Sequence, residues 1–399
     1  HNHPRILAAR QKFQELKKME VHKNFLSPFV AGLSHNIAQL LPGDLNSVYF
    51  CNSGAEAVEG AMKMAYKFHE GTRSKILHSD ISFHGKLLGA ASVTGSPELH
   101  FDFPQIPGTE SFKFGDIDDI REKIKSLRTP DGESDLYAVI IEPFSASSLQ
   151  ACSDEFLTEV RSLCDEEGIV LIYDEVYTSW AKTGPLFYFM KSGVAPDIVT
   201  TSKSFGGGKA SISAYVARES IFREAYDNKR DATLHSTTYN ALGEECVTAI
   251  EAINIVVEDD YVGRANHIEQ KLGLALRTMQ EKHGSLIKDV RGSGALWGIV
   301  IDSSIGGVLS SVIEPLASRL AHDDQIFEKL VAGSVISHLY NKHSILTFFG
   351  SNQDLALIIS PSLIVEDEEI DRFVDALDET LSTGKSRLVA ELVKGKFIG

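Results

Sequence analysis

A lysine and an aspartate, each following an apolar segment, are the residues best placed to do chemistry. Lys203 lies in the stretch PDIVTTSKSFGGG (196–208), where a strand leads into a glycine-rich turn, and Asp174 lies 29 residues earlier, near the end of IVLIYDE (169–175). A lysine amine held at a strand end can form an imine with an aldehyde, and a buried carboxylate can keep a heterocyclic nitrogen protonated. Taken alone, a strand-end lysine is more often a surface charge, so its neighbours decide the interpretation.

A strand-to-helix junction at Ser53, Gly54 and Ala55 offers a place for a phosphate group. The first backbone N–H groups of a helix have no helical acceptor, and the positive end of the helix dipole attracts anions. The same residues also suit an ordinary helix start, in which Ser53 caps the helix and Gly54 fits the turn. The sequence leaves these two interpretations open.

Two further segments fit a planar, charged ligand. Phe83 is followed by His84 and Gly85, so its ring could stack on a heterocycle, although a core phenylalanine beside a surface histidine is the plainer interpretation. Asp174 and Glu175 are adjacent carboxylates after an apolar run, and burial raises a carboxyl pKa unless a cation or donor compensates. A protonated pyridine nitrogen is one such partner, while solvent or a salt bridge is the alternative.

Two other kinds of site fit poorly. The run Gly206-Gly-Gly-Lys-Ala lacks the spacing of a Walker phosphate loop, and no histidine pair at ligand spacing lies near Asp174, so we expect no metal. Pyridoxal phosphate, in contrast, requires both a lysine for its aldehyde and a carboxylate for its ring nitrogen. We therefore expect pyridoxal 5'-phosphate as the cofactor.

The elements that position these residues alternate in type along the chain. Apolar strands are predicted at 48–51, 75–78, 138–141, 169–173, 198–200 and 213–217, and a helix from Gly54 places Ala57, Ala61, Ala65 and Phe68 on one face. Strands alternating with helices indicate an α/β fold with a mainly parallel sheet, whose carboxyl edge binds ligands. Ser53, Asp174 and Lys203 all follow such strand ends.

The organisation of the chain follows from the same patterns. Residues 1–22 are expected to be the remnant of an N-terminal segment, 23–257 a large cofactor-binding domain and 258–399 a small C-terminal domain. A helix over 247–257 leads into the small domain, which mixes a helix at 263–283 with strands at 294–301 and 355–359. We therefore expect an α+β architecture for this second domain.

Composition narrows the classes of function. The chain has 399 residues, 43% of them hydrophobic, and a formal net charge of −16, which argues against nucleic acid or an anionic membrane as the main partner. Its four cysteines have no metal-site spacing, and no apolar run reaches the roughly 18 to 20 residues that span a bilayer. We expect a cytoplasmic protein, and we expect residues upstream of His1.

Nearly the whole chain resembles the class III (ω-) aminotransferases, which are fold type I pyridoxal phosphate enzymes. The motifs occur in the family's order along the chain, and the following sequence segments carry the resemblance: His1-Asn-His-Pro, Leu41-Pro-Gly-Asp, Cys51-Asn-Ser-Gly-Ala-Glu-Ala-Val-Glu, Phe83-His-Gly-Lys, Ile141-Glu-Pro, Asp174-Glu-Val, Thr183-Gly, Pro196-Asp-Ile, Ser202-Lys, Gly206-Gly-Gly, His235-Ser-Thr-Thr-Tyr and Arg291-Gly-Ser-Gly. The resemblance implies a seven-stranded-type sheet in the large domain and a transaminase working by ping-pong amino transfer.

The resemblance also implies a role for each matching residue. Lys203 matches the Schiff-base lysine and proton shuttle, and Asp174 matches the partner of the pyridinium nitrogen. Thr238 matches a threonine that reaches the phosphate in the neighbouring subunit, which implies a homodimer with shared active sites. The remaining cofactor-binding residues implied by the family are Ser53, Gly54 and Ala55 at the phosphate, Phe83 and Val176 on the two ring faces, and His84, Glu142 and Tyr177 nearby.

Departures from the family pattern concern the substrate. Ile358 stands where amino-acid transaminases carry an arginine for the substrate α-carboxylate, and Ser147 stands where they carry a glutamate that pairs with that arginine. Losing one member of a buried ion pair is costly, whereas replacing both is nearly neutral. We therefore expect a neutral pocket and an amine, aldehyde or ketone substrate without an α-carboxylate, unless another arginine or lysine reaches the site.

Other departures leave alternatives open. Tyr177 replaces a glutamine that donates to the cofactor's phenolic oxygen, and its hydroxyl either substitutes or points away. Phe144, Trp180 and Tyr177 either line a pocket for a bulky apolar carbonyl compound of secondary metabolism, as in prodiginine-type pathways, or belong to the core or to an interface. Aminomutases, epimerases and a decarboxylase of the same family are alternatives to a transaminase, and a non-catalytic scaffold that keeps the fold is the alternative of another class.

Overall fold

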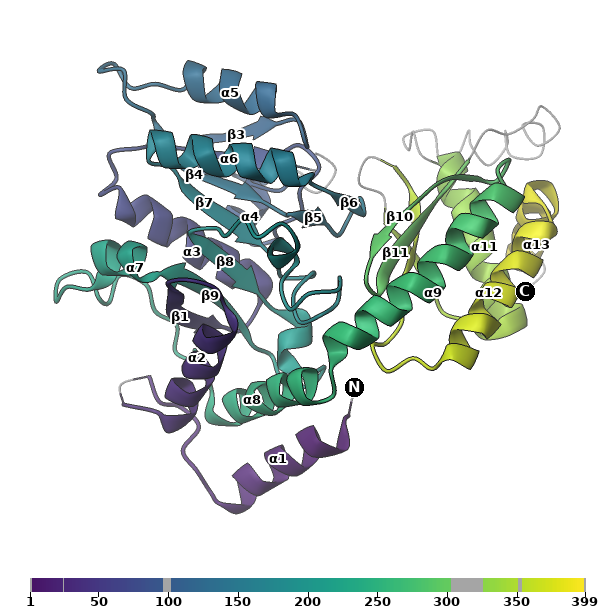
Figure 1. Ribbon diagram of the computed structural model, residues 1–399, viewed down its shortest axis with the longest axis horizontal. Helices are drawn as coiled ribbons and strands as arrows, with labels where there is room; N and C mark the ends of the chain where they lie inside the picture. The colour runs from purple at the N-terminus through teal and green to yellow at the C-terminus, as the bar shows by residue number, and fades with distance from the viewer. Residues whose placement is uncertain (1, 24, 96–101, 303–325, 351–353, 398–399) are drawn as a thin grey trace. The chain divides into compact units, whose positions relative to one another are not determined.

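The computed structural model describes residues 2–23, 25–95, 102–302, 326–350 and 354–397 (Figure 1). His1, the first residue of the N-terminal motif, lies outside the described residues. The chain divides into two compact units: the first comprises His1–Ala146 and Ala151–Val262, and the second comprises Ser147–Gln150 and Gly263–Gly399. The predicted boundary at 257/258 falls at the end of a helix in the first unit, and residues 1–22 group with that unit as well.

A seven-stranded sheet forms the centre of the first unit, in the order β1-β9-β8-β7-β4-β2-β3. The strands from β8 to β3 run parallel, whereas β9 is antiparallel to both of its neighbours. This confirms the predicted α/β fold and mainly parallel sheet. The strands are β1 (Leu45–Cys51), β2 (Lys75–Ser79), β3 (Thr109–Phe112), β4 (Leu136–Ile141), β7 (Val170–Asp174), β8 (Ile198–Thr201) and β9 (Ser213–Arg218).

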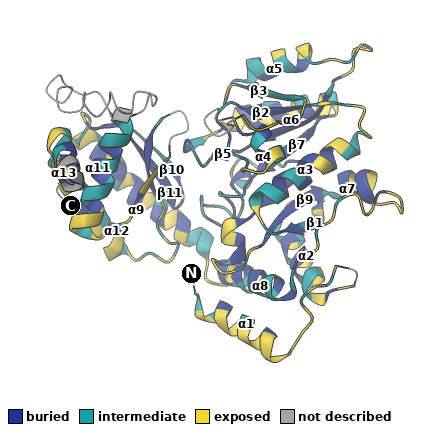
Figure 2. Ribbon diagram, turned by 180° about the vertical axis from the view of Figure 1, so that it is seen from behind, coloured by how far each residue is buried: buried dark blue, intermediate teal, exposed yellow. Residues whose placement is uncertain are grey.

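Side chains alternate between two cores because successive strand residues point to opposite faces. In β4, Val139 and Ile141 join one hydrophobic cluster, while Ala138 and Ile140 join the other. A sheet buried on both faces needs nearly continuous apolar strands, which explains why these segments stood out in the sequence. Figure 2 shows the buried residues concentrated along the strands and on the helix sides that face them.

Helices cover both faces of this sheet. Ala57, Ala61 and Ala65 of α3 are fully buried against it and Phe68 is partly buried, as the helical spacing predicted. Small side chains allow α3 to pack closely on the strands. The helices of the first unit are α1 (Pro4–Glu15), α2 (Pro28–Leu40), α3 (Gly54–Phe68), α4 (Leu88–Ser92), α5 (Ile117–Ser126), α6 (Asp154–Glu167), α7 (Glu219–Tyr226) and α8 (Gly243–Glu258), with short 3-10 helices η2 (Tyr188–Lys191) and η3 (Lys203–Gly206).

The second unit is built on a four-stranded antiparallel sheet in the order β10-β11-β13-β12. Its strands are β10 (Ile287–Ser293), β11 (Leu296–Ile301), β12 (Phe348–Gly350) and β13 (Ala356–Ile359), and its helices are α9 (Tyr261–Lys282), α11 (Ile326–His343), α12 (Asp367–Ser382) and α13 (Lys385–Phe397). Trp297 is fully buried in this unit's core and packs on Gly273 of α9. The α+β architecture expected for the second domain is confirmed.

Several strands were not expected from the sequence. β3 is an edge strand of sequence TESF, too polar to show an apolar run, and β10 carries five charged or small residues among its seven. A short hairpin of β5 (Phe144–Ser145) and β6 (Gln150–Ala151) also follows β4. In the described part of the chain, no helix is long and apolar enough to cross a membrane.

Candidate active site

Lys203 is held in a tightly anchored turn directly after β8. It begins η3 with a left-handed φ of 48°, a conformation that costs a lysine about 1 kcal/mol and needs support from its surroundings. Thr201 supplies part of that support, because its hydroxyl lies 2.7 Å from the Ser179 hydroxyl and accepts a hydrogen bond from the Trp180 indole at 2.8 Å. The Trp180 ring also stacks on Phe205, with centroids 5.3 Å apart.

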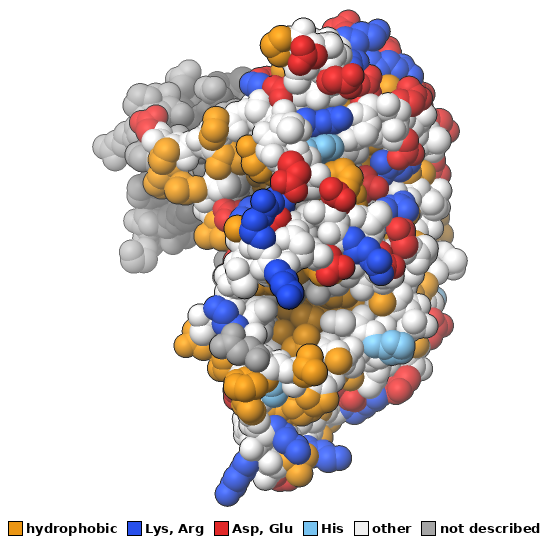
Figure 3. Space-filling view, turned by 90° about the vertical axis from the view of Figure 1, so that its left-hand side faces the viewer, with side chains coloured by type: hydrophobic (Ala, Val, Ile, Leu, Met, Phe, Trp, Pro, Cys, Tyr) orange, Lys and Arg blue, Asp and Glu red, His pale blue; other side chains and the backbone are white. Residues whose placement is uncertain are grey.

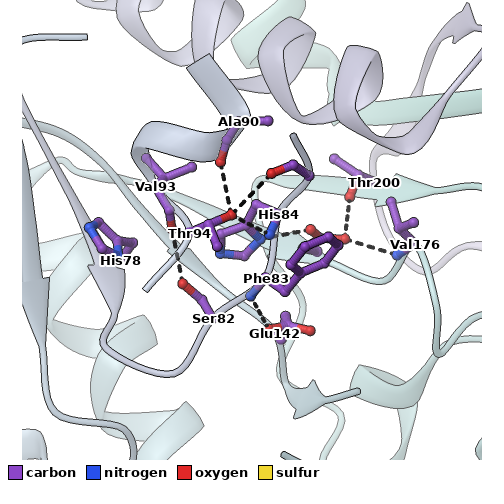
Figure 4. A network of polar contacts seen from close by, with 12 residues as sticks. His78, Ser82, Phe83, His84, Ala90, Val93, Thr94, Glu142, Val176 and Thr200 are labelled. Carbon is purple, nitrogen blue, oxygen red and sulfur yellow. Dashed lines mark hydrogen bonds and ion pairs between the residues drawn. The ribbon is translucent and has the colours of Figure 1, made fainter. Parts of the chain in front are cut away.

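Asp174 lies at the end of β7, the strand next to β8, and is almost completely buried. Its Oδ2 is 2.7 Å from Nδ1 of His84, and its Oδ1 accepts hydrogen bonds from the Val176 amide and the Thr200 hydroxyl at 2.9 and 3.0 Å (Figure 4). Burial raises the pKa of Asp174, but the hydrogen bond and charge of His84, the Val176 amide and the charge of Lys203 outweigh it and hold that pKa below its ordinary value. Asp174 is therefore ionised, as a partner for a protonated ring nitrogen must be.

The plainer interpretation of the sequence predicted a core Phe83 and a surface His84, and the structure shows the reverse order of exposure. His84 is 3% exposed and supports Asp174, while the neighbouring Phe83 is only partly buried (Figure 4). The His84 amide donates to the Thr94 hydroxyl at 3.0 Å, which fixes the backbone of the pair. The surface-histidine alternative is wrong for this segment, because the Asp174 carboxylate draws the imidazole inward.

Glu142 joins the same group from the end of β4. Its Oε2 accepts a hydrogen bond from the Phe83 amide at 2.9 Å, and its Oε1 accepts one from the Ala146 amide at 3.3 Å. Burial raises the pKa of Glu142 to about 7, with the charge of Asp174 adding to the effect. Glu142 thus anchors the Phe83 backbone and is close to half-protonated at neutral pH.

The junction at Ser53 keeps both of the roles that the sequence left open. Ser53 caps α3 by accepting from the Glu56 amide at 3.4 Å, so its hydroxyl is already engaged. The amides of Gly54 and Ala55 occupy the first two helical positions, which have no helical acceptor and point out of the helix end. A Cβ on Gly54 would lie 2.7 Å from Val176, so glycine is required for this close approach.

Tyr177 lies against Lys203. Its ring face covers the lysine amine, with Nζ 4.4 Å from the ring centroid. Part of the Lys203 side chain is open to solvent, yet the protein packed around the amine lowers the pKa of Lys203 through burial, against the charges of Asp174 and Glu142, which raise it. The amine is therefore easier to deprotonate than an ordinary lysine.

Other predicted residues lie elsewhere. Thr238 is exposed in the connection between α7 and α8 of the first unit. Trp180 is 1% exposed within its main hydrophobic cluster, and Phe144 is 1% exposed and packs on Tyr188, so the core alternative holds for both in this chain. Sequence reasoning missed Thr200, Thr201 and Thr94, whose hydroxyls serve Asp174, the Lys203 turn and His84. Thr200 and Thr201 could have been found as a pair of threonines that ends an apolar strand next to the strand of the Asp174 carboxylate.

These residues suit pyridoxal phosphate. The ionised, buried carboxylate of Asp174 suits its ring nitrogen, and the partly exposed Phe83 and Val176 suit the two ring faces. The free helix start at Gly54 suits its phosphate, and Lys203, with its lowered pKa, suits its aldehyde. When bound, the cofactor supplies an aldehyde that condenses with amines and a protonated ring that accepts electron density.

Comparison with known proteins agrees with this geometry. The family model for class III aminotransferases matches residues 1–381. The chain belongs to the class III aminotransferase family. It is a pyridoxal phosphate-dependent transaminase, and the cofactor expected from Lys203 and Asp174 is confirmed at the level of the family.

Solved structures of transaminases share the fold of this class III aminotransferase. They include ornithine aminotransferase from Toxoplasma gondii (22% identity, 96% of this chain and 83% of that chain, TM-score 0.80). An (S)-enantioselective ω-transaminase from Thermomicrobium roseum matches at 23% identity over 96% of this chain and 85% of that chain, with a TM-score of 0.82. A transaminase from the marine bacterium Virgibacillus matches at 20% identity over 98% and 86%, with a TM-score of 0.83.

Proposed function

We propose that this transaminase acts on an amine, aldehyde or ketone that has no α-carboxylate. The observation that carries the proposal is the chemistry around Ile358, at the position where the family's amino-acid transaminases hold the carboxylate-binding arginine. Ile358 pairs with Phe348 of β12 on one side and with Gly298 of β11 on the other. Directly paired residues share a sheet face, so this face of the second unit presents apolar or small groups where a guanidinium is expected.

Ser147, which replaces the family's glutamate, belongs to the same surroundings. A Cβ built on Gly350 of β12 would lie 2.9 Å from the Ser147 carbonyl oxygen and 3.1 Å from Cδ1 of Ile358. The two departures therefore adjoin one another through Gly350, within the second unit. This neighbourhood supports the loss of an ion pair as a unit, because either charge alone would remain without its partner.

Arg291 is the arginine nearest to a substitute on this face, since it pairs with Gly298. Its guanidinium, however, is engaged by Asp289 at 2.6 Å and by Asp354 at 2.7 Å, and its Nη1 donates to the Ser148 carbonyl at 3.4 Å. Releasing it to a substrate would break both ion pairs and leave Asp354 with Lys288 alone, at 3.4 Å. Arg291 is thus a structural residue, which favours a neutral substrate group here.

The proposed roles at the first unit follow the contacts described above. Lys203 would hold the cofactor through its aldehyde and would carry the proton to and from the substrate carbon, and Asp174, fixed by His84, would keep the ring nitrogen protonated. Phe83 and Val176 enclose the ring, and Glu142 anchors the Phe83 backbone. Gly54 and Ala55 bind the phosphate through their amides, Ser53 holds the helix start, and Tyr177 lies beside Lys203.

We also propose a homodimer in which Thr238 reaches the phosphate of the partner's cofactor. Exposed Thr238 follows Leu234 in a connection that borders an apolar cavity of about 780 Å³ lined by Tyr66, Leu88 and Tyr137 among others. Hydrophobic side chains also gather around a hollow on the molecular face shown in Figure 3. Exposed apolar areas of this kind are typical of subunit interfaces.

A cytoplasmic location and a biosynthetic role complete the proposal. The four cysteines, Cys51, Cys152, Cys164 and Cys246, are free and buried, which suits a reducing compartment. The apolar surroundings of Ile358 suit a hydrophobic carbonyl compound of secondary metabolism.

Half-reactions test the substrate class directly. The purified enzyme is mixed with glutamate, alanine or an aliphatic amine, and conversion of pyridoxal phosphate to pyridoxamine phosphate is followed by absorbance. We expect the amine to react at least tenfold faster than either amino acid. A strong, exclusive preference for glutamate would refute the proposed substrate class, and failure of any donor to form pyridoxamine phosphate would refute amino transfer.

A further inference from the structure

Tyr177 departs from the family's glutamine, and its contact with Lys203 is made by the ring. Nζ of Lys203 lies over the Tyr177 ring, 4.4 Å from its centroid. A cation at this distance from an aromatic face is attracted by the ring's negative quadrupole. A glutamine side chain has no such face, so the substitution gives the lysine a neighbour of a different chemical kind.

The turn that carries Tyr177 is fixed on both sides. The preceding residue, Val176, donates its amide to Asp174 at 2.9 Å, and the following residue, Thr178, donates its hydroxyl to buried Glu175 at 2.8 Å. Glu175 in turn accepts from the backbone amides of Tyr188 and Phe189, at 2.6 and 2.8 Å. Tyr177 is therefore presented from a rigid segment, and its ring position is a property of the fold.

We propose that Tyr177 is a positioning residue whose ring face holds the free amine of Lys203, independently of the tyrosine hydroxyl. The inference rests on the proposed role of Lys203 as the reactive lysine. In that role, the Lys203 amine would be free while the substrate is bound to the cofactor, and it would have to stay in place to move a proton. The ring provides a resting position for the released ammonium without tying it to a carboxylate.

The charges around Lys203 show why an uncharged holder is useful. Asp174 at the end of β7 and Glu142 after β4 are the acidic groups that act on Lys203, and Asp174 is already bonded to His84. An ion pair between Lys203 and Asp174 would compete for the carboxylate that the cofactor ring needs. The Tyr177 face attracts the ammonium while leaving Asp174 with its partners.

The test measures the titration of Lys203 itself. The whole enzyme is loaded with pyridoxamine 5'-phosphate, which cannot bond to lysine, and lysines are labelled at a series of pH values with a trace amine-reactive reagent and quantified by mass spectrometry. Cation–π contacts of about 0.5 to 2 kcal/mol correspond to roughly 0.4 to 1.5 pH units. Tyr177→Leu should lower the midpoint for Lys203 by that amount, because the ammonium loses its stabilising face.

Tyr177→Phe is the matched variant, since it keeps the ring and removes the hydroxyl. We expect its Lys203 midpoint to stay within about 0.2 pH units of the wild type, a margin small against the cation–π shift. Tyr177→Gln provides a second ring-free variant in case Tyr177→Leu does not fold, and it should shift as Leu does. Lys191, whose amine lies 5.7 Å from the Tyr188 ring centroid, is an internal standard that should not move in any variant.

The outcomes separate this inference from the proposed function. If Phe shifts Lys203 as far as Leu and Gln do, or if no variant shifts it, the ring face does not hold the amine and the inference is wrong. Borohydride treatment of the enzyme loaded with pyridoxal phosphate, followed by peptide mapping, tests the premise separately. An adduct on a lysine other than Lys203 would overturn the proposed role of Lys203 itself.

Discussion

The strand ends of the first unit and the β12–β13 face of the second unit differ in how they depart from the class III pattern. In the first unit, Asp174 is hydrogen-bonded to His84 and Thr200, and a Trp180–Thr201 hydrogen bond anchors the chain just before Lys203. Around Ile358, two family charges are missing together and the remaining arginine is engaged in ion pairs. The part that performs the chemistry is retained, while the part we assign to substrate recognition has changed.

The difference follows from how tightly each group is coupled to its neighbours. Asp174 has three hydrogen-bonding partners from three segments, so changing any one leaves a buried polar group unpaired. The absent arginine and glutamate would have depended mainly on each other, and a mutual pair can be lost in two substitutions at little net cost. Residues that recognise the substrate are therefore easier to replace than those hydrogen-bonded around Asp174.

The largest expected effect on the reaction rate concerns the strand ends of the first unit, where the class III residues are retained. Asp174→Asn keeps the size of the side chain but removes the charge that keeps the ring nitrogen protonated. Removing one partner of a buried charge pair costs about 3 to 5 kcal/mol, which corresponds to roughly 10²- to 5 × 10³-fold in rate. The measurement is the single-turnover rate with an amine donor.

Val176→Ala is the control for this prediction, because it alters a ring contact without touching a charge. Its rate should fall by only about 5- to 15-fold, because the loss of two methyl groups costs about 1 to 1.6 kcal/mol. A rate for Asp174→Asn within fivefold of the wild type would show that the first unit's carboxylate is not the ring's partner.

The second largest expected effect concerns the β12–β13 face of the second unit, where the two charges of the family are missing. Ile358→Arg together with Ser147→Glu restores the ion pair that the family carries, and a bidentate contact to a carboxylate is worth about 1.5 to 3 kcal/mol. We expect kcat/KM for glutamate to rise by roughly 10- to 100-fold relative to the aliphatic amine. Steady-state kinetics with both donors provides the measurement.

Single and conservative variants sharpen this result. Ile358→Lys with Ser147→Glu adds a point charge without the planar fork, so its gain should be smaller. Ile358→Leu keeps the surroundings apolar and should leave the preference for the amine unchanged. If none of the charged variants improves glutamate turnover, the β12–β13 face does not select the substrate.

The sequence could predict the strand ends better than the contacts between them. Apolar runs located β4, β7 and β8, and the rule that parallel strands share a carboxyl edge predicted Asp174 and Lys203 at one edge; that their strands are neighbours comes from the structure. β3 was not predicted, because an edge strand can be polar and then shows no apolar run in the sequence. The inward turn of His84 and the core positions of Trp180 and Phe144 depend on tertiary packing, which spacing along one chain does not encode.

The smallest expected effect concerns the adjacent carboxylates Asp174 and Glu175 in the first unit. Asp174 and Glu175 are both buried, yet the pKa of Asp174 lies below its ordinary value, whereas burial raises the pKa of Glu175 to about 7 despite hydrogen bonds from Phe189, Tyr188 and Thr178. The folded protein therefore binds a proton at Glu175 more tightly than the unfolded chain does. Its contribution to stability is complete below the unfolded pKa near 4.5 and is lost as pH rises through 7.

Glu175→Gln imitates the protonated carboxyl group and cannot titrate. Between pH 5 and pH 8, the free energy of unfolding of the wild type should fall relative to that of the variant by about 2 kcal/mol, the order expected for this pKa shift. Denaturant unfolding of both proteins at matched concentration measures the difference. A difference that stays constant across this range would mean that Glu175 is ionised like Asp174, and that the hydrogen bonds at the Tyr177 turn outweigh burial at both carboxylates.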